Sequence, residues 1–408
     1  MEHLLGWLFF LIIFFFILVF TKKNKYIRKF LIISFILRLL LVLLDYYNLV
    51  NLPDSSGDAI YFEVDARNFS RNEGLSIIFN LFVSGPYFMS KIISIFYTVF
   101  GESALMARGI SVALGTMSVY LVYHICYLVW DIHSARRASL VATFFPTLIL
   151  YSTLILREVY IVFFLLLALI ATIRFIKTNS FISFLQVIII FFLLSFFHGP
   201  VSLGGLTFLL YILLGKIKKQ LINLYNYKIN LSSLFISFIL FIPFYLFLNN
   251  SLVIPYLGTF ESLINFEQTF DRLNSAYFQD AASYPTSLMI NNGYEIFTKG
   301  TLKIFYFLYS PFIWDVSKPS HILGFIDGIS YFILTIYVIK NWNAVWENAV
   351  TKFFVLLFVT YLIIYGIGVG NFGTVIRHRS KFVMILIILA APKLHKFIFS
   401  TNKKLYKR

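Results

Sequence analysis

The sequence has almost no cysteine and few charged residues. Its one cysteine, Cys126, lies in an apolar run, which excludes a disulfide framework and a cysteine-based metal site. Only 13% of the 408 residues are charged, whereas 60% are hydrophobic. A chain of this length cannot hide so much apolar surface in one soluble core. Composition therefore predicts an all-α, polytopic integral membrane protein, folded as a single transmembrane domain over residues 1–408.

Acidic residues are scarce as well, with 18 Asp and Glu against 34 Lys and Arg, a net charge of +16. The positions of the charges decide what this excess means. Basic residues cluster in alternate short connections, at 22–29, 136–137, 174–177, 216–219 and 403–408. Most acids fall in the other connections. This pattern is typical of cytoplasmic basic loops, so we do not expect nucleic acid as a partner.

A bilayer core about 30 Å thick requires about 20 residues of helix. On that basis the sequence predicts about eleven transmembrane helices, with the N-terminus outside and the C-terminus inside. The predicted spans are 4–21, 29–48, 105–130, 138–154, 159–174, 181–197, 200–214, 231–248, 322–339, 353–370 and 381–399. The apolar segments 85–100 and 301–314 would break the alternation, so they are predicted to be re-entrant or interfacial. Outer loops are expected at 49–104 and 249–302.

The first outer loop concentrates acidic groups between long apolar runs. Pro53 and Gly57 break any helix, so Asp58 is expected on a turn just outside the hydrocarbon. From residue 59 onward the spacing predicts an amphipathic helix along the membrane surface, with Tyr61 on it. Asp58 is a candidate catalytic carboxylate. The alternative is that it only caps this helix.

Two further polar groups stand at expected helix ends. Arg157 and Glu158 form a hinge between two apolar runs, where charged residues pair or face a water-filled cavity. Consecutive helical residues point about 100° apart, so each is expected to have its own partner. The alternative is a boundary ion pair that fixes helix packing. His198 stands between an outward and a returning helix. It is a candidate for binding substrate or carrying a proton, and the alternative is that it only packs against its neighbours.

The last outer connection carries Asn371, Arg377, His378 and Arg379. The positive-inside rule disfavours three basic residues together in an outer connection. Guanidinium groups beside glycine-rich backbone suit a phosphate or pyrophosphate, because they match its oxygens bidentately. Snorkelling to lipid headgroups is the alternative. The long loop 249–302, which carries Arg272, is rich in polar and aromatic residues and is a candidate lid or substrate-binding loop.

Several short elements resemble a known family when taken in order. Gly57-Asp58-Ala59-x-Tyr61, Phe100-Gly-Glu-Ser103 and Ala107-Arg108-Gly-Ile-Ser111 resemble the start of the GT-C glycosyltransferases, multi-spanning enzymes that take sugars from polyprenyl-phosphate carriers. Leu156-Arg-Glu158, Pro311-Phe-Ile-Trp314 and Asn371-x-Gly-Thr374-x-x-Arg377-His-Arg379 look like bacterial O-antigen and capsule repeat-unit polymerases. One helix precedes the usual first helix of the family.

The resemblance implies a GT-C-like fold and a transferase in the bacterial inner membrane with its active site facing the periplasm. Asp58 would be the general base, and Arg377 and Arg379 would hold the donor's lipid phosphate. The donor would be a polyprenyl-(pyro)phosphate-linked sugar and the acceptor a glycan, with membrane lipid around them and a chain-length regulator as a further partner. No cofactor is implied, and dependence on a divalent metal stays open because the family's second loop acid is replaced by Arg157-Glu158.

The chemistry of sugar transfer requires the same residue types. Transfer of a sugar from a lipid phosphate to a hydroxyl needs a carboxylate to accept the proton and cations to stabilise the leaving phosphate. Direct displacement inverts the anomeric configuration. Together with the resemblance, which implies polymerisation of O-antigen, capsule or exopolysaccharide repeat units, the expected function is an inverting membrane glycosyltransferase of that kind. The alternatives are a single-sugar transferase and a flippase or transporter of lipid-linked glycans.

Overall fold

The computed structural model describes residues 2–82, 87–225 and 283–394, with a few isolated positions between 238 and 261. These residues form helices joined by short turns, and the one extended pairing among them is an antiparallel bridge between Ser283 and Asn371. Six of the described helices are long and apolar enough to cross a membrane, at 2–20, 104–129, 157–178, 199–220, 321–340 and 349–368. The protein is therefore a helical, multi-pass membrane protein.

The described residues of the N-terminal half form ten α-helices and two short 3-10 helices. The α-helices are α1 (Glu2–Phe20), α2 (Lys25–Tyr46), α3 (Asp58–Asn72), α4 (Phe88–Phe100), α5 (Ala104–Val129), α6 (Ile132–Phe144), α7 (Pro146–Tyr151), α8 (Arg157–Thr178), α9 (Phe181–Phe197) and α10 (Leu203–Tyr225). The 3-10 helices are η1 (Gly74–Ile78) and η2 (Gly199–Ser202). The predicted spans near 4–21, 29–48, 105–130, 159–174, 181–197 and 200–214 each coincide with one of these α-helices.

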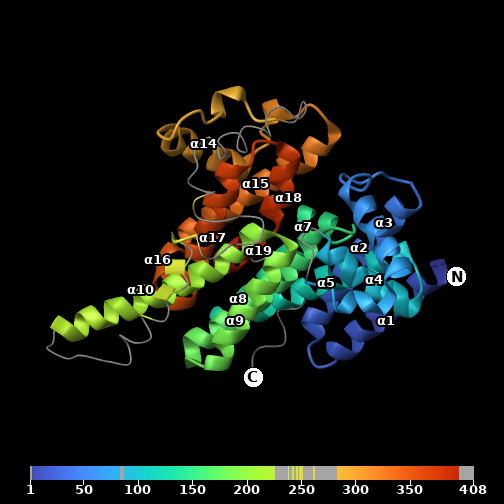
Figure 1. The fold of residues 1–408 in the computed structure, drawn as a ribbon, viewed down its shortest axis with the longest axis horizontal. Helices are drawn as coiled ribbons and strands as arrows, with labels where there is room; N and C mark the ends of the chain where they lie inside the picture. The colour runs from blue at the N-terminus through green and yellow to red at the C-terminus, as the bar shows by residue number, and fades with distance from the viewer. Residues whose placement is uncertain are drawn as a thin grey trace, which may run out of the picture.

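The C-terminal part contains the remaining described elements. They are η3 (Thr286–Leu288), α14 (Glu295–Tyr309), η4 (Ile313–Asp315), α15 (Pro319–Lys340), α16 (Trp342–Glu347), α17 (Ala349–Gly368), α18 (Phe372–Ser380) and α19 (Val383–Ala390). Figure 1 shows α1 to α5 gathered on one side and α14, α15, α17 and α18 on the other. The fully buried helix α19 lies between the groups and contacts α5, α6, α15 and α17.

Two predicted spans differ from the structure. The segment predicted as one helix over 138–154 is two helices, because α6 ends at Phe144 and α7 begins at Pro146, whose ring cannot continue the preceding helix. The last predicted span, 381–399, begins instead as α19 at Val383 and gives way to turns at 391–394. Most of the span predicted at 231–248 lies outside the described residues, as does the part of the long loop that contains Arg272.

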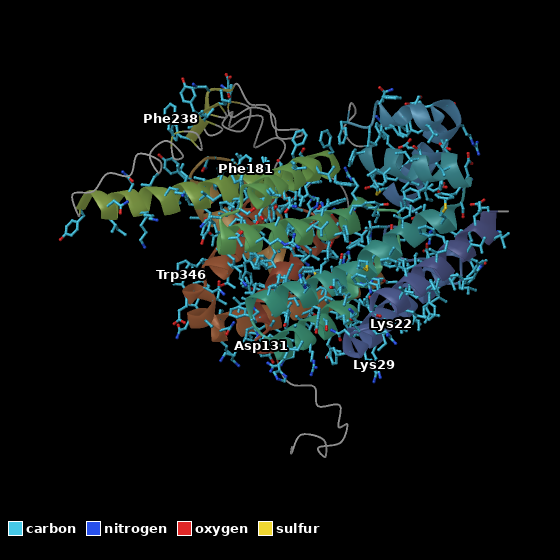
Figure 2. All side chains as sticks on the ribbon, turned by 90° about the horizontal axis from the view of Figure 1, so that it is seen from below. Lys22, Lys29, Asp131, Phe181, Phe238 and Trp346 are labelled. Carbon is cyan, nitrogen blue, oxygen red and sulfur yellow. The ribbon has the colours of Figure 1, made fainter. Side chains whose placement is uncertain are left out.

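The helix ends fall into two sets at opposite ends of the bundle. At one end, turns far apart in sequence are bonded to each other: Asn24 donates to Tyr123, Lys177 to the Leu128 carbonyl oxygen, and Trp130 to that of Ile388. Figure 2 looks onto the structure from below, with Lys22, Lys29, Asp131 and Trp346 labelled. We call the end of the bundle that carries these bonded turns the basic end. Three of the predicted cytoplasmic connections lie here, with their basic residues at 22–29, 136–137 and 174–177.

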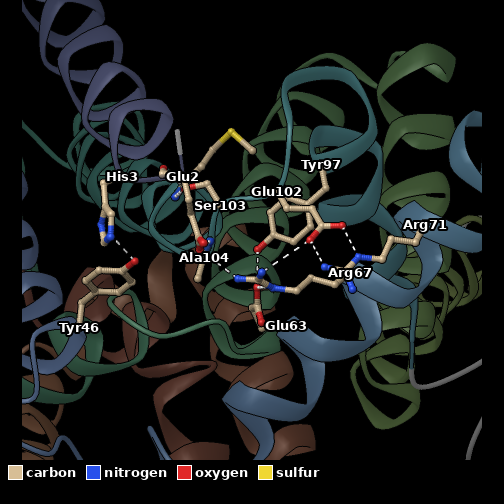
Figure 3. Close-up of polar contacts among 11 residues, drawn as sticks. Glu2, His3, Tyr46, Glu63, Arg67, Arg71, Tyr97, Glu102, Ser103 and Ala104 are labelled. Carbon is tan, nitrogen blue, oxygen red and sulfur yellow. Dashed lines mark hydrogen bonds and ion pairs between the residues drawn. The ribbon is translucent and has the colours of Figure 1, made fainter.

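The opposite end carries α3 and α4, the helical pair of the loop between α2 and α5. Amphipathic α3 matches the predicted surface helix, and α4, with 13 residues, is too short to span a bilayer. Polar contacts tie the pair to the bundle (Figure 3). Arg67 of α3 contacts Glu2, Glu63 and Glu102 at 3.0, 2.5 and 3.6 Å, and Arg71 contacts Glu102 through two nitrogens. Helix α1 thus helps to fix the orientation of α3.

Candidate functional site

Asp58 and Arg377 meet at the end of the bundle that carries α3. Asp58 is the first residue of α3, after Gly57, and its side chain is about half exposed (48%). Arg377 lies on α18, 319 positions further along the chain, and its Nη1 donates to Asp58 Oδ2 at 2.7 Å. The carboxylate is therefore held by an ion pair at the mouth of the site. Asp58 also lies in the first turn of α3, where the helix dipole favours a negative charge.

Behind this pair lies Glu158, whose side chain is only 2% exposed. Its Oε1 is 3.4 Å from Arg377 Nε and 3.7 Å from Lys381 Nζ. Its Oε2 is buried and has no hydrogen-bond partner among the described residues. A buried carboxylate normally has all its oxygens satisfied, so this free oxygen is a place where water or a substrate group would bind.

Two histidines and a tyrosine complete the inner wall. Lys381 Nζ donates to His378 Nδ1 at 2.8 Å, the rings of His378 and His198 lie 5.2 Å apart, and Tyr365 Oη is 2.9 Å from His198 Nδ1. Burial lowers the pKa of His378 well below its usual value, and the positive charge of Lys381 lowers it further. His378 is therefore neutral near pH 7, and its Nδ1 accepts the hydrogen bond that Lys381 donates.

Arg157 occupies a different position from Glu158, as expected from their separation on the helix. Its guanidinium carbon lies 5.1 Å from the centre of the Phe62 ring, and its Nη1 lies 3.5 Å from the carbonyl oxygen of Phe197. Arg157 and Glu158 do not pair with each other, because Glu158 faces Arg377 and Lys381. Arg157 instead links α8 to α3, the helix that carries Asp58, and to the end of α9.

One candidate lies elsewhere: Arg379 does not reach the site. Its side chain is fully buried, and its Nε pairs with Asp327 Oδ2 at 2.6 Å inside the bundle. On an α-helix two residues apart in sequence point about 200° apart, so Arg377 and Arg379 face opposite sides of α18. The expectation that both arginines and His378 converge is therefore wrong for Arg379, which belongs to the packing of α15 against α18.

Two more candidates have local positions of their own. Asn371 is the N-cap of α18, where its side chain accepts from the backbone N–H groups of Gly373 and Thr374. Tyr61 lies on the exposed side of α3. Neither is brought against the Asp58–Arg377 pair by a contact seen in the structure, and Arg272 lies outside the described residues.

Sequence reasoning missed two members of the site. Lys381 was expected as the first residue of a transmembrane span, yet it is buried against Glu158 and His378. Asp54 was counted only as one of the loop acids, but its Oδ2 accepts a bond from Tyr151 Oη at 3.3 Å. Burial raises the pKa of Asp54, although Arg377 nearby opposes the rise. A lysine two residues after the Arg-His-Arg run was the available signal.

The charges of the site balance. Three carboxylates, Asp54, Asp58 and Glu158, lie among three cations, Arg157, Arg377 and Lys381. Among the described residues, no group of three or more His, Cys, Asp or Glu side chains is placed to hold a metal ion. Such a site combines a half-exposed carboxylate with two cations behind it. It can accept a proton and bind an anion on the same face.

Comparison with known proteins gives no family. No protein-family model matches the chain, and no curated protein matches it. Any functional conclusion must therefore come from the residues themselves.

Proposed function

We propose that the protein is a membrane glycosyltransferase that takes glycans from a polyprenyl-(pyro)phosphate carrier and polymerises the repeat units of a bacterial O-antigen, capsule or exopolysaccharide. The observation that carries the proposal is the Asp58–Arg377 pair, with Glu158 and Lys381 behind it. A proton acceptor and anion-binding cations are the two groups that transfer from a phosphate-linked sugar requires.

The position of the site supports its proposed orientation. The lysine and arginine residues at 22–29, 136–137 and 174–177 lie at the basic end, which the positive-inside rule assigns to the cytoplasm. Asp58 and Arg377 lie at the opposite end. In this proposal the site faces the periplasm, and the cytoplasmic membrane is the one the protein spans.

The pairing of Asp58 with Arg377 gives the order of events. The incoming donor phosphate competes for the Arg377 guanidinium, which binds phosphate bidentately as readily as it binds a carboxylate. Asp58 is then released toward the acceptor. It accepts the proton of the acceptor hydroxyl while that oxygen bonds to the anomeric carbon, and the carbon–oxygen bond to the phosphate breaks with its electron pair leaving on phosphate. Direct displacement inverts the anomeric configuration.

The cations have separate tasks in this scheme. Arg377 lies 17% exposed and can reach the phosphate, whereas Lys381 is buried and acts through Glu158 and His378. Burial alone lowers the pKa of Arg377, but the carboxylates of Glu158, Asp58 and Asp54 more than offset this effect. Arg377 is therefore charged at every working pH, and the leaving phosphate always meets a cation.

The test is polymer synthesis by the purified protein. In nanodiscs supplied with the host's polyprenyl-pyrophosphate-linked repeat unit, wild-type protein is expected to make a ladder of longer glycans on a gel. Asp58→Asn is expected to lower turnover about 10²- to 10⁴-fold, the usual share of general-base catalysis. The N-cap of α3 is Gly57 and not Asp58, so the substitution removes no capping bond and folding should persist. The matched control is Asp65→Asn, the same chemical change about two turns further along α3.

The same experiment separates the two rival functions. A flippase moves the lipid-linked glycan across a vesicle and leaves its mass unchanged, whereas a single-sugar transferase adds one residue and no ladder. Fully buried Arg38 in α2, bonded to Ser34 and Ser152, is the feature that a transporter would share, because ionisable groups inside membrane helices often line substrate paths. Full-length polymer from Asp58→Asn would contradict the general-base role.

A further inference from the structure

A pocket of about 230 Å³ lies beside the Asp58–Arg377 pair, on the side of α15. Its walls come from the turn before α3, from α7, from the start of α15 and from α18. Four polar side chains line it: Asp54, Tyr151, Lys318 and His321. None of the four was singled out as a functional residue by the sequence.

Asp54 is held at this pocket by an unusual backbone conformation. Its φ is +66°, in the left-handed region that only a few non-glycine residues such as aspartate adopt. Such strain tends to persist where the surrounding structure fixes a functional side chain. One oxygen of the Asp54 carboxylate accepts from Tyr151, and a carboxylate has about four acceptor positions, so capacity remains for a ligand.

The lining decides what class of ligand fits. Donor and acceptor groups are both present, with Asp54 negative and Lys318 positive, and apolar walls are supplied by Leu150 and Leu323. A sugar ring presents hydroxyls at its edge and C–H groups on its faces, which match this mixture. A phosphate is disfavoured because it would face the Asp54 carboxylate. The volume is below the roughly 300–1,000 Å³ of sites for drug-sized ligands, so it suits a single ring.

We propose that this pocket binds the terminal sugar ring of the acceptor glycan, with Asp54 accepting a hydrogen bond from one of its hydroxyls. The inference rests on the proposed function, because it names where the acceptor of that reaction sits. Asp54 and Asp58 belong to the same short segment before and at the start of α3, four residues apart. A ring held by Asp54 would therefore bring a neighbouring hydroxyl toward Asp58, and the donor would approach over Arg377.

The first experiment is a split of kinetic constants. Asp54→Asn is expected to raise the acceptor KM about 10- to 100-fold, the usual effect of losing a hydrogen bond to a charged group, while the donor KM stays near wild type. Lys318→Gln provides a second variant, because Lys318 is exposed and its substitution leaves the packing intact. It is expected to raise the acceptor KM in the same direction. A rise in donor KM instead would assign the pocket to the carrier phosphate and overturn the inference.

The second experiment needs no turnover. Lipid-free glycan released by mild acid from the host's own carrier is titrated against the protein in nanodiscs. Wild type is expected to bind it, and Asp54→Asn to bind it at least tenfold more weakly. If wild type makes polymer but Asp54→Asn has wild-type acceptor KM and glycan affinity, the pocket assignment is wrong and the proposed function stands. If wild type makes no polymer but binds free glycan through Asp54, the proposed function fails and the pocket remains.

The pH dependence of that binding follows from burial. Burial raises the pKa of Asp54, and Arg377 opposes the rise. The Asp54 carboxylate accepts a hydrogen bond strongly only when it is charged. Glycan affinity is therefore full above the pKa of Asp54 and is lost as the pH falls through that pKa. Because burial raises this pKa, the loss occurs at a higher pH than for an ordinary aspartate. The titratable groups around Asp54 are Arg377, Tyr151, Glu158 and Asp58, with Lys318 and His321 across the pocket. Glycan affinity that falls identically in Asp54→Asn would assign the effect to another of these groups and contradict the inference.

Discussion

Replacing Arg379 by alanine should destabilise the protein strongly while the site itself remains intact. The Arg379 guanidinium is fully buried and makes an ion pair with Asp327 at 2.6 Å. It also donates to the carbonyl oxygens of Ser310 and Gly324 at 2.6 and 2.8 Å. After substitution, buried Asp327 keeps only the bond from Thr147 Oγ1 at 2.7 Å. An uncompensated buried charge of this kind costs about 3–5 kcal/mol.

A double variant supplies the matched control. Arg379→Met combined with Asp327→Leu removes both charges and keeps similar volume, a change that is often neutral or stabilising by about 1–4 kcal/mol. We therefore expect Arg379→Ala alone to unfold much earlier than wild type and the double variant to recover most of the loss. The measurement is the midpoint of unfolding in mixed detergent–SDS micelles.

Activity then decides between packing and substrate binding. The double variant, once folded, should still make polymer, because neither residue contacts the Asp58–Arg377 pair. If Arg379→Ala unfolds with wild type but makes no polymer, or if the stable double variant is inactive, Arg379 acts on the substrate and our placement of it in the packing is mistaken.

The remaining predictions concern orientation and the exposed arginine. Ser56→Cys should react with an impermeant thiol reagent from outside intact cells, and Lys23→Cys only after the inner side is opened; Cys126 is buried, so the background should be low. The opposite labelling order would reverse the proposed orientation. Arg377→Lys keeps the charge but loses the two-pronged contact, so polymer should shorten with an unfolding midpoint close to wild type. If Arg377→Lys makes polymer of wild-type length, a point charge is sufficient at this position and the two-pronged contact is not required.

Much of the fold followed from local signals in the sequence. Hydrophobic runs of membrane length located most of the described helices, and the amphipathic spacing after Gly57 located α3 with Asp58 at its start. The sequence predicted one helix over 138–154, but α6 ends at Phe144 and α7 begins at Pro146. Whether a proline bends a helix or ends it depends on what packs against it, which the local sequence does not contain.

The site was predicted in part, and its misses have a common physical cause. Asp58, Glu158 and Arg377 were each singled out, but their mutual contact depends on packing between segments hundreds of residues apart. Arg377 and Arg379 look equivalent in sequence and differ only in the side of α18 that they occupy. The partner that captures Arg379 is Asp327, which stands in an apolar run and gave no signal as an isolated acid. Pairing of buried charges is a tertiary property.

The arrangement of α18 limits how the site can open. This helix of nine residues carries Arg377 on one side and is anchored on the other by Arg379, whose side chain is bonded to α15 and to the carbonyl groups after α14. Moving the Arg377 backbone would break buried bonds, whereas the ion pairs that join α3 to Glu2 and Glu102 are partly exposed, so water and salt weaken them. Helix α18 is therefore the fixed side of the site, and α3 is the side that we expect to move: under the proposed function, substrate entry would shift Asp58 while Arg377 stays in place.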